Sequence, residues 1–388
     1  MAGTIRRLVA GAAGVAGLSA LVRAAWDVPE ELGATANEIA PVAAGASSYR
    51  DRKFHNTEPS VQLAPGSSPS LLTSVLTRRN VGRPPRPVPL VSEPPAGTAG
   101  ALAVTWYGHA SALLEVDGFR VLTDPVWSER VSPSQLVGPA RLHPVPLPLT
   151  DLPPLDAIVI SHDHYDHLDL ATVRALTDTQ DALFVVPLGI GAHLRKWRVP
   201  AARIVELDWG TSTTLNRPAG SGADALVITC TEARHFSGRG TSRNLTQWAS
   251  WVISGPRHRA YFGGDTGYTK AFAEIGANYG PFDLTLLPVG AYDEHWPDIH
   301  MNPEEAVAAH ADVCVGAAGY GVMVPIHWAT FNLAFHPWVE PIRRMRAAAQ
   351  AAGTRTAVPL PGQRLDIDTL SPQVEWWEDV DKPGKTDE

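Results

Sequence analysis

A layered α/β sandwich, in which helices pack against sheets, is the fold class that this sequence predicts. Short apolar runs rich in β-branched residues recur between residues 101 and 330, and several of them end at a histidine or an aspartate. Residues 170–176 have helical spacing, and a second helix is expected from residue 303. Because each of the polar candidates follows a strand, we expect them to meet along one edge of the layered structure.

The expected elements follow one another from residue 101. Asp117-Gly118 predicts a hairpin turn between a strand ending at residue 116 and a strand at 119–123, which indicates an antiparallel sheet edge. Residues 132–154 contain seven prolines and predict an ordered loop. Asn302-Pro303 followed by two glutamates predicts a helix start. Further strands are expected at 102–106, 157–160, 184–187, 204–208, 225–231, 250–253, 258–262, 282–290 and 322–326.

Composition excludes several classes of protein. The chain of 388 residues is long enough for a substantial core. Its 32 basic and 40 acidic residues give a net charge of -8, so we expect no nucleic-acid partner. Only Cys230 and Cys314 are present, which excludes a disulfide scaffold and a thiolate zinc site.

Residues 1–32 are an apolar, signal-like segment. Arg6 and Arg7 precede fifteen residues, 8–22, made only of Leu, Val, Ala, Gly and one Ser. The run is short and glycine-rich for a spanning helix, and no clear cleavage site follows it. We expect an anchor or interfacial helix first, an export signal second and a disordered leader third. The protein is then cytoplasmic or peripheral to a membrane, with export left open.

Two more segments flank a predicted domain at residues 101–373. Residues 33–100 are rich in Ala, Gly, Ser and Pro and predict an extended arm. Within the arm, residues 52–56 form a basic patch around Phe54, a candidate for docking on the domain. Residues 374–388 end in a charged stretch, and we expect a poorly ordered tail.

The densest group of metal-ligand side chains follows the strand at residues 157–160. It comprises His162, His164, Asp166 and His167, in the pattern H-x-H-x-D-H. A core must satisfy the polar atoms of such side chains, and imidazole nitrogen and carboxylate oxygen are usual zinc ligands. The first two histidines can reach one ion while the aspartate and the last histidine reach a second. The pattern therefore predicts a metal site.

Other strands end at further candidates. His235 and His327 each follow a strand, and Asp265 lies in a glycine-rich turn that lets the backbone approach a ligand. His109 and Asp124 follow the earliest strands. For these two, hydrogen bonding to a metal-bound histidine and a purely local structural role remain equal alternatives.

Several motifs together resemble the N-acylphosphatidylethanolamine-hydrolysing phospholipase D family of the metallo-β-lactamase superfamily. The resemblance covers about residues 101 to 345 and includes motifs beyond the ligands: Thr105-Trp106, Gly108-His109-Ala110, Leu122-Thr123-Asp124-Pro125, Ser132-Pro133-Ser134-Gln135, residues 161–169, Gly264-Asp265-Thr266-Gly267-Tyr268, Gly290-Ala291-Tyr292, residues 303–307 and Ile326-His327-Trp328. It implies a four-layer αβ/βα sandwich, the metallo-β-lactamase fold, with two zinc ions between the sheets.

The resemblance also implies roles for residues. It assigns His162, His164 and His235 to the first zinc ion, Asp166, His167 and His327 to the second, and Asp265 to both. Other first-row divalent metals are alternatives to zinc. Tyr165 and His300 match positions that contact the phospholipid head group, and Asp265 and His300 are the catalytic candidates.

The activity that the resemblance implies is that of a zinc-dependent phosphodiesterase of phospholipase D type. A hydroxide held by two metals would hydrolyse N-acylphosphatidylethanolamine to N-acylethanolamine and phosphatidic acid. Expected partners are a phospholipid or other phosphodiester, a membrane surface and a second copy of the chain. Alternatives are hydrolysis of a lactone, β-lactam, thioester or soluble phosphodiester, and a non-catalytic lipid-binding role. Residues 291–299 are more acidic than in the family's usual form, which leaves the head-group preference open.

Overall fold

The computed structural model describes residues 28–66, 73–74, 77, 80–95, 97–217, 225–316 and 319–383. The apolar run at residues 8–22, for which we predicted an anchor or interfacial helix, lies outside the described residues. Among the residues that are described, none of the helices has both the length and the apolar character needed to cross a bilayer.

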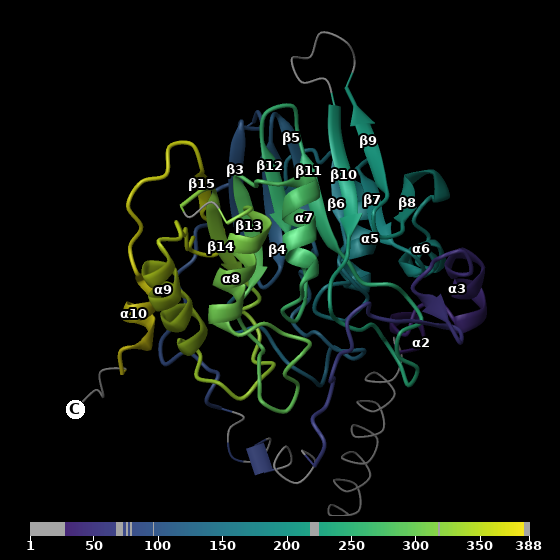
Figure 1. Cartoon of the computed structure of the whole chain (residues 1–388), viewed down its shortest axis with the longest axis horizontal. Coiled ribbons are helices and arrows are strands. Elements are labelled where there is room, and N and C mark those ends of the chain that lie inside the picture. The colour runs from purple at the N-terminus through teal and green to yellow at the C-terminus, as the bar shows by residue number, and fades with distance from the viewer. Residues whose placement is uncertain are drawn as a thin grey trace, which may run out of the picture.

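Two mixed β-sheets pack face to face (Figure 1). One has seven strands in the order β15-β3-β4-β5-β6-β7-β8, and the other has six in the order β14-β13-β12-β11-β10-β9. The strands of the first sheet are β3 (Leu102–Gly108), β4 (Ser111–Val116), β5 (Phe119–Thr123), β6 (Ala157–Val159), β7 (Leu183–Pro187), β8 (Ile204–Leu207) and β15 (Arg364–Asp366). Those of the second are β9 (Ser212–Asn216), β10 (Ala225–Thr231), β11 (Ser250–Ser254), β12 (Arg259–Phe262), β13 (Leu284–Pro288) and β14 (Val322–Ile326).

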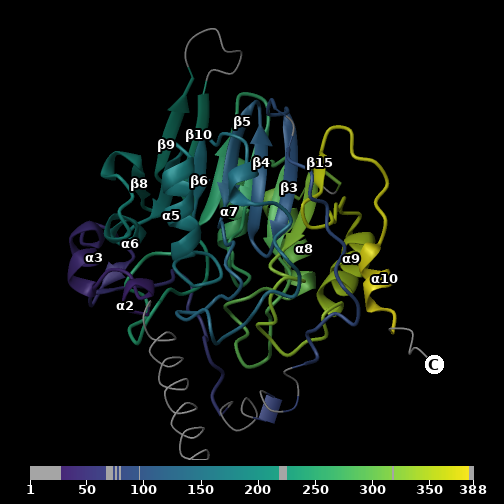
Figure 2. The same ribbon diagram turned by 180° about the vertical axis from the view of Figure 1, so that it is seen from behind.

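Helices cover the outer face of each sheet (Figures 1 and 2). The six-stranded sheet carries α7 (Ala271–Tyr279) and α8 (Pro303–Val313), with α9 (Glu340–Ala352) beside α8. The seven-stranded sheet carries α5 (Leu170–Thr179) and α6 (Ile190–Lys196). Short 3-10 turns form at η1 (Leu149–Asp151) and η2 (Ala201–Arg203). These four layers confirm the predicted αβ/βα sandwich.

The main hydrophobic core lies between the two sheets. Trp106 and Val121 of one sheet share a buried cluster with Ile228, Trp251 and Phe262 of the other. A second buried cluster joins the seven-stranded sheet to α5 and α6. Every strand residue from β3 to β6 is buried, including the charged Glu115 of β4 and Arg120 of β5.

The local signals of the sequence have mixed outcomes. The Asp117-Gly118 hairpin is confirmed, with Val116 paired to Phe119. The start of α8 is also confirmed, because Asn302 accepts a hydrogen bond from the Glu305 amide and the Glu305 carboxylate accepts one from the Asn302 amide. The expectation that the hairpin forms the sheet edge is wrong. β15, from far along the chain, pairs with β3 and forms that edge.

The predicted arm is only partly extended. Near its start lie α2 (Val28–Glu31), α3 (Ala36–Ala43) and a hairpin of β1 (Tyr49–Arg50) and β2 (Lys53–Phe54). Phe54 is fully buried and packs in a cluster with Ala233 and Trp248 of the domain. The patch at residues 52–56 therefore docks on the domain through its aromatic ring.

The expectation of a poorly ordered carboxyl end is wrong for residues 376–381, which form α10 (Trp376–Asp381). Trp376 is 6% exposed and Trp377 2%. The Trp376 ring stacks on Trp328, with the ring centroids 5.4 Å apart. Burial of a large indole ring contributes favourable free energy to folding. Burial of Trp376 and Trp377 therefore holds α10 against the core.

Candidate metal centre

Four strand ends converge on the predicted site. The loop after β6 carries residues 162–167, and β10, β12 and β14 end shortly before His235, Asp265 and His327. Five of the seven predicted ligands are buried, and the other two, His164 and Asp166, are partly exposed. The fold thus brings together side chains that are separated by up to 165 positions in the chain, from His162 to His327.

Three histidines form the first group of candidate ligands. One nitrogen from each of His162, His164 and His235 lies within 4.8 Å of the others. His162 Nε2 and His164 Nδ1 are 2.8 Å apart. These are the three residues that the resemblance assigns to the first zinc ion.

The second group contains the remaining members of the loop and the last strand end. One candidate ligand atom from each of Asp166, His167, His327 and His109 lies within 4.8 Å of the others. Asp166 Oδ2 is 3.4 Å from Nε2 of His167 and 3.4 Å from Nε2 of His327. Two separate sets of donors are therefore present side by side.

Asp265 lies between the two groups. Its Oδ2 is 3.1 Å from Nε2 of both His167 and His327, and 3.8 Å from Nε2 of both His162 and His235. One carboxylate thus faces histidines of both sets, which is the arrangement that a bridging ligand requires.

The residues present fit a bound cation. Four buried ligand atoms have no hydrogen-bond partner in the part of the chain that the structure describes: Nε2 of His167, His235 and His327, and Oδ1 of Asp265. Unpaired buried polar atoms are costly, and natural structures rarely leave several together. A metal would satisfy all of them, and this nitrogen and oxygen donor set suits zinc and its first-row neighbours.

The electrostatics of the cluster keep its carboxylates charged. Burial alone would raise the pKa of Asp265, but His167, His327 and His300 hold it well below its usual value. Burial and the neighbouring His167 and His164 hold the pKa of His162 well below its usual value. An ionised carboxylate and a neutral imidazole are the protonation states that bind metal.

Two further residues hold these ligands by hydrogen bonds. Asp124 Oδ2 is 2.6 Å from Nδ1 of His167, and the Asp124 carboxylate also accepts a 2.6 Å hydrogen bond from the Ser161 amide. His109 Nε2 is 2.9 Å from Asp166 Oδ2. The sequence left open whether His109 and Asp124 hydrogen-bond to a metal ligand or have a local structural role. In the structure each of them contacts a candidate ligand.

The two predicted head-group residues lie at the margin of the cluster. The Tyr165 hydroxyl donates a 2.6 Å hydrogen bond to the Arg239 carbonyl, and its ring lies 4.1 Å from the Arg239 guanidinium carbon. His300 Nδ1 is 3.9 Å from Asp265 Oδ2. Burial lowers the pKa of His300 to about 4, although Asp265 acts in the opposite direction.

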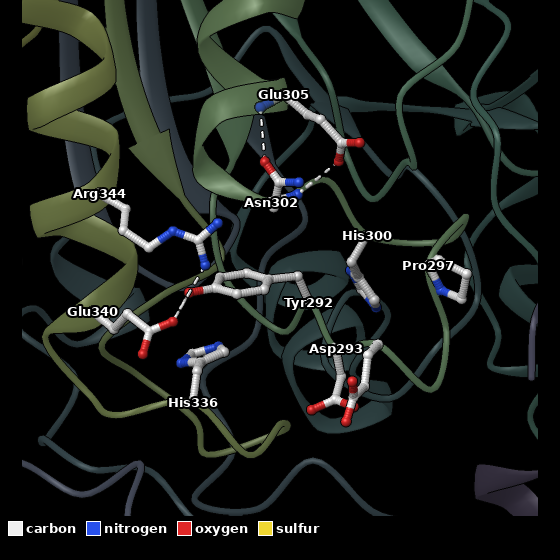
Figure 3. Close-up of a pocket in the computed structure, with 10 residues that line it drawn as sticks. Tyr292, Asp293, Pro297, His300, Asn302, Glu305, His336, Glu340 and Arg344 are labelled. Carbon is white, nitrogen blue, oxygen red and sulfur yellow. Dashed lines mark hydrogen bonds and ion pairs between the residues drawn. The ribbon is translucent and has the colours of Figure 1, made fainter. Parts of the chain in front are cut away.

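A cavity of about 510 Å³ opens beside His300 (Figure 3). Its lining includes four carboxylates and one guanidinium: Asp293, Glu294, Glu305, Glu340 and Arg344. Tyr292 donates a 2.6 Å hydrogen bond to Glu340, and His336 stacks on its ring. The sequence signalled the acidity of residues 291–299, but it gave no sign that α9 would add Glu340 and Arg344.

Two donor sets that share one carboxylate, at the edge of an αβ/βα sandwich, define a metal-dependent hydrolase of the metallo-β-lactamase type. Residues 119–328 match the family described as the beta-lactamase superfamily domain. The chain belongs to this superfamily.

Similar proteins extend the comparison. An uncharacterized protein of Mycobacterium tuberculosis is 54% identical over 374 residues, which are 96% of this chain and 98% of that protein. N-acyl-phosphatidylethanolamine-hydrolyzing phospholipase D 1 of Caenorhabditis elegans is 38% identical over 240 residues, covering 60% of this chain and 65% of that protein. The crystal structure of isothiocyanate hydrolase from Delia radicum gut bacteria has a TM-score of 0.53 at 20% identity, with 68% of this chain and 98% of that chain covered. The last likeness concerns the fold alone.

Proposed function

We propose that this protein is a zinc-dependent phosphodiesterase of phospholipase D type that hydrolyses N-acylphosphatidylethanolamine-like phospholipids. The observation that carries the proposal is the position of Asp265, which faces both histidine groups at 3.1 to 3.8 Å. The 38% identity to the C. elegans enzyme supports the choice of substrate. Water adds to phosphorus, the bond to the head-group oxygen breaks, and phosphatidic acid and N-acylethanolamine result.

Different residues of the chain would have different roles in the reaction. Two bound zinc ions would supply an activated water and neutralise the phosphate charge. Asp265 would hold both ions and accept the proton of the water. Burial lowers the pKa of His300 to about 4, and a neutral imidazole still keeps one N–H that could donate a hydrogen bond to a phosphate oxygen. Tyr165, which is itself part of the ligand loop, would contact the head group as well.

The cavity beside His300 supports a head group without negative charge. Four carboxylates line it against one guanidinium. Arg344 is itself held by Glu304 at 2.6 Å and Glu340 at 3.3 Å, so its charge is already balanced. Like charges repel at short range, and an anionic head group would be disfavoured. The neutral amide of an N-acylethanolamine meets no such penalty.

Two exposed apolar side chains support action at a lipid surface. Leu136 and Val137 are 51% and 60% exposed in the proline-rich loop. Val131, directly before this loop of residues 132–154, packs in a cluster with Phe331 that also contacts Tyr165. The loop therefore lies near the ligand loop, where insertion of two apolar residues into lipid would bring the centre to its substrate.

The test uses the purified, zinc-loaded full chain and N-acylphosphatidylethanolamine in mixed micelles. We expect release of N-acylethanolamine, loss of turnover on chelation and recovery on addition of zinc. In water enriched with ¹⁸O, the label should enter phosphatidic acid, because the bond to phosphorus is the one that breaks. Turnover of soluble diesters alone would remove the lipid claim. Zinc binding without turnover of any ester would favour the non-catalytic alternative.

A further inference from the structure

A segment of the amino-terminal arm, residues 54–64, runs across the loops that build the metal centre. We refer to it as the strap. The Pro59 carbonyl accepts hydrogen bonds from Arg234, the Val61 amide donates a 2.7 Å hydrogen bond to Asp298, and the Ala64 amide donates one of 2.7 Å to the His295 carbonyl. The strap lies outside residues 119–328, which match the superfamily.

Asn56 is the strap residue that reaches a candidate ligand. Its Nδ2 donates a 2.8 Å hydrogen bond to the His235 carbonyl, and its Oδ1 accepts a 3.1 Å hydrogen bond from the His235 amide. Oδ1 also accepts a 2.9 Å hydrogen bond from Trp248 Nε1. One side-chain amide thus pairs with both main-chain groups of His235, which needs a donor and an acceptor on the same group.

His235 depends on such contacts because it lies four positions beyond Thr231, the last residue of β10. Its ring is held separately, with Nδ1 2.8 Å from the Ile299 carbonyl. Asn56 holds the main chain of His235, and the Ile299 carbonyl holds Nδ1. Nε2 is therefore the ring nitrogen that is left to bind a metal. That atom is buried without a hydrogen-bond partner among the described residues and lies 3.8 Å from Asp265 Oδ2.

We propose that Asn56 is a positioning residue for the metal ligand His235, so that the arm is a working part of the metal centre. Residues that orient a ligand without touching the metal contribute to metal affinity, and removing one typically weakens binding about 10- to 100-fold. The inference rests on the metal centre and not on the phospholipid substrate, so the two can fail independently.

The test measures zinc affinity of the full chain by competition with a chromophoric chelator, without any substrate. For Asn56→Ala we expect the zinc dissociation constant of the weakened site to rise about 10- to 100-fold. Asn56→Asp keeps the volume and the acceptor for the His235 amide but sets an oxygen against the His235 carbonyl in place of the donor, so we expect a rise of similar size. Asn37→Ala is the matched control, because Asn37 lies in the same arm, is exposed and accepts a 2.8 Å hydrogen bond from Arg52.

Thermal unfolding with and without zinc separates positioning from folding. A positioning role predicts that zinc raises the Tm of Asn56→Ala less than that of the unmodified chain. A lowered Tm of the metal-free variant with an unchanged zinc-induced rise would mean a structural role only and would overturn the proposal. Wild-type zinc affinity in Asn56→Ala, or failure of both Asn56 variants to fold, would overturn it as well.

Discussion

The carboxylate of Asp124 and the imidazole of His167 are both fully buried and meet at 2.6 Å between Oδ2 and Nδ1. This contact fixes the ring so that Nε2 faces Asp265. For Asp124→Ala we expect zinc affinity to fall about 10- to 100-fold and turnover to fall with it. Chelator competition measures the affinity, with exposed Asp151→Ala as control. An unchanged dissociation constant would refute the orienting role.

Charge reversal at the rim of the cavity should change head-group selectivity. Glu294 lines the cavity, is exposed and has no ion-pair or hydrogen-bond partner within the described ranges. For Glu294→Lys we expect kcat/KM for diesters with an anionic head group to rise about fivefold relative to neutral ones, equivalent to roughly 1 kcal/mol. Glu93→Lys makes the same charge change at another exposed position. Equal selectivity in the two variants would show that the cavity does not read the head group.

Polar replacement of the exposed loop pair should separate lipid contact from chemistry. For the double variant Leu136→Asp, Val137→Asp we expect turnover on vesicles to fall about tenfold, because the favourable transfer of two apolar side chains from water into lipid is lost. Hydrolysis of a soluble phosphodiester should stay within twofold of the original rate, since the chemistry itself is not touched. A parallel loss on both substrates would instead indicate damage to the centre.

Acid should weaken the fold through Asp117 at the β4–β5 turn. Burial would raise the pKa of this carboxyl, but hydrogen bonds from Arg257 and His258 hold it below the ordinary value of 3.8. A lowered pKa stabilises the fold above pH 3.8, and that contribution is lost as the pH falls further. Asp117→Asn should cost about 1–3 kcal/mol at pH 7, with the difference closing in strong acid.

Denaturant unfolding at several pH values measures this difference. Asp51→Asn is the matched control, because Asp51 also has a positive φ, of 53°, but is exposed. A gap between Asp117→Asn and the original chain that stays constant down to pH 3 would contradict the assignment.

The parts of this molecule that short-range patterns describe were predictable from sequence. Buried strands, the Asp117-Gly118 turn and the capped start of α8 each depend on neighbours in the chain, and the structure has them. The ligand loop belongs to this group, because its spacing alone predicts two donor sets.

Contacts between distant segments were not predictable. The pairing of β15 with β3 and the stacking of Trp376 on Trp328 depend on the tertiary fold. Asn56 belongs with them, because an asparagine in a polar arm gives no signal that it meets a main chain 179 positions later. The sequence contains no pattern that predicts which loops residues 54–64 contact.

The edge strand contributed by residues 364–366 has a practical consequence for protein production. Trimming a recombinant fragment to the 119–328 limits of the conserved family would delete β3, β4 and β15, and with them the wall that closes one side of the sandwich. Such a fragment would expose the apolar faces of β5 and its neighbours to solvent and would aggregate. A recombinant version should therefore keep β3, β4 and β15, all of which lie outside those limits.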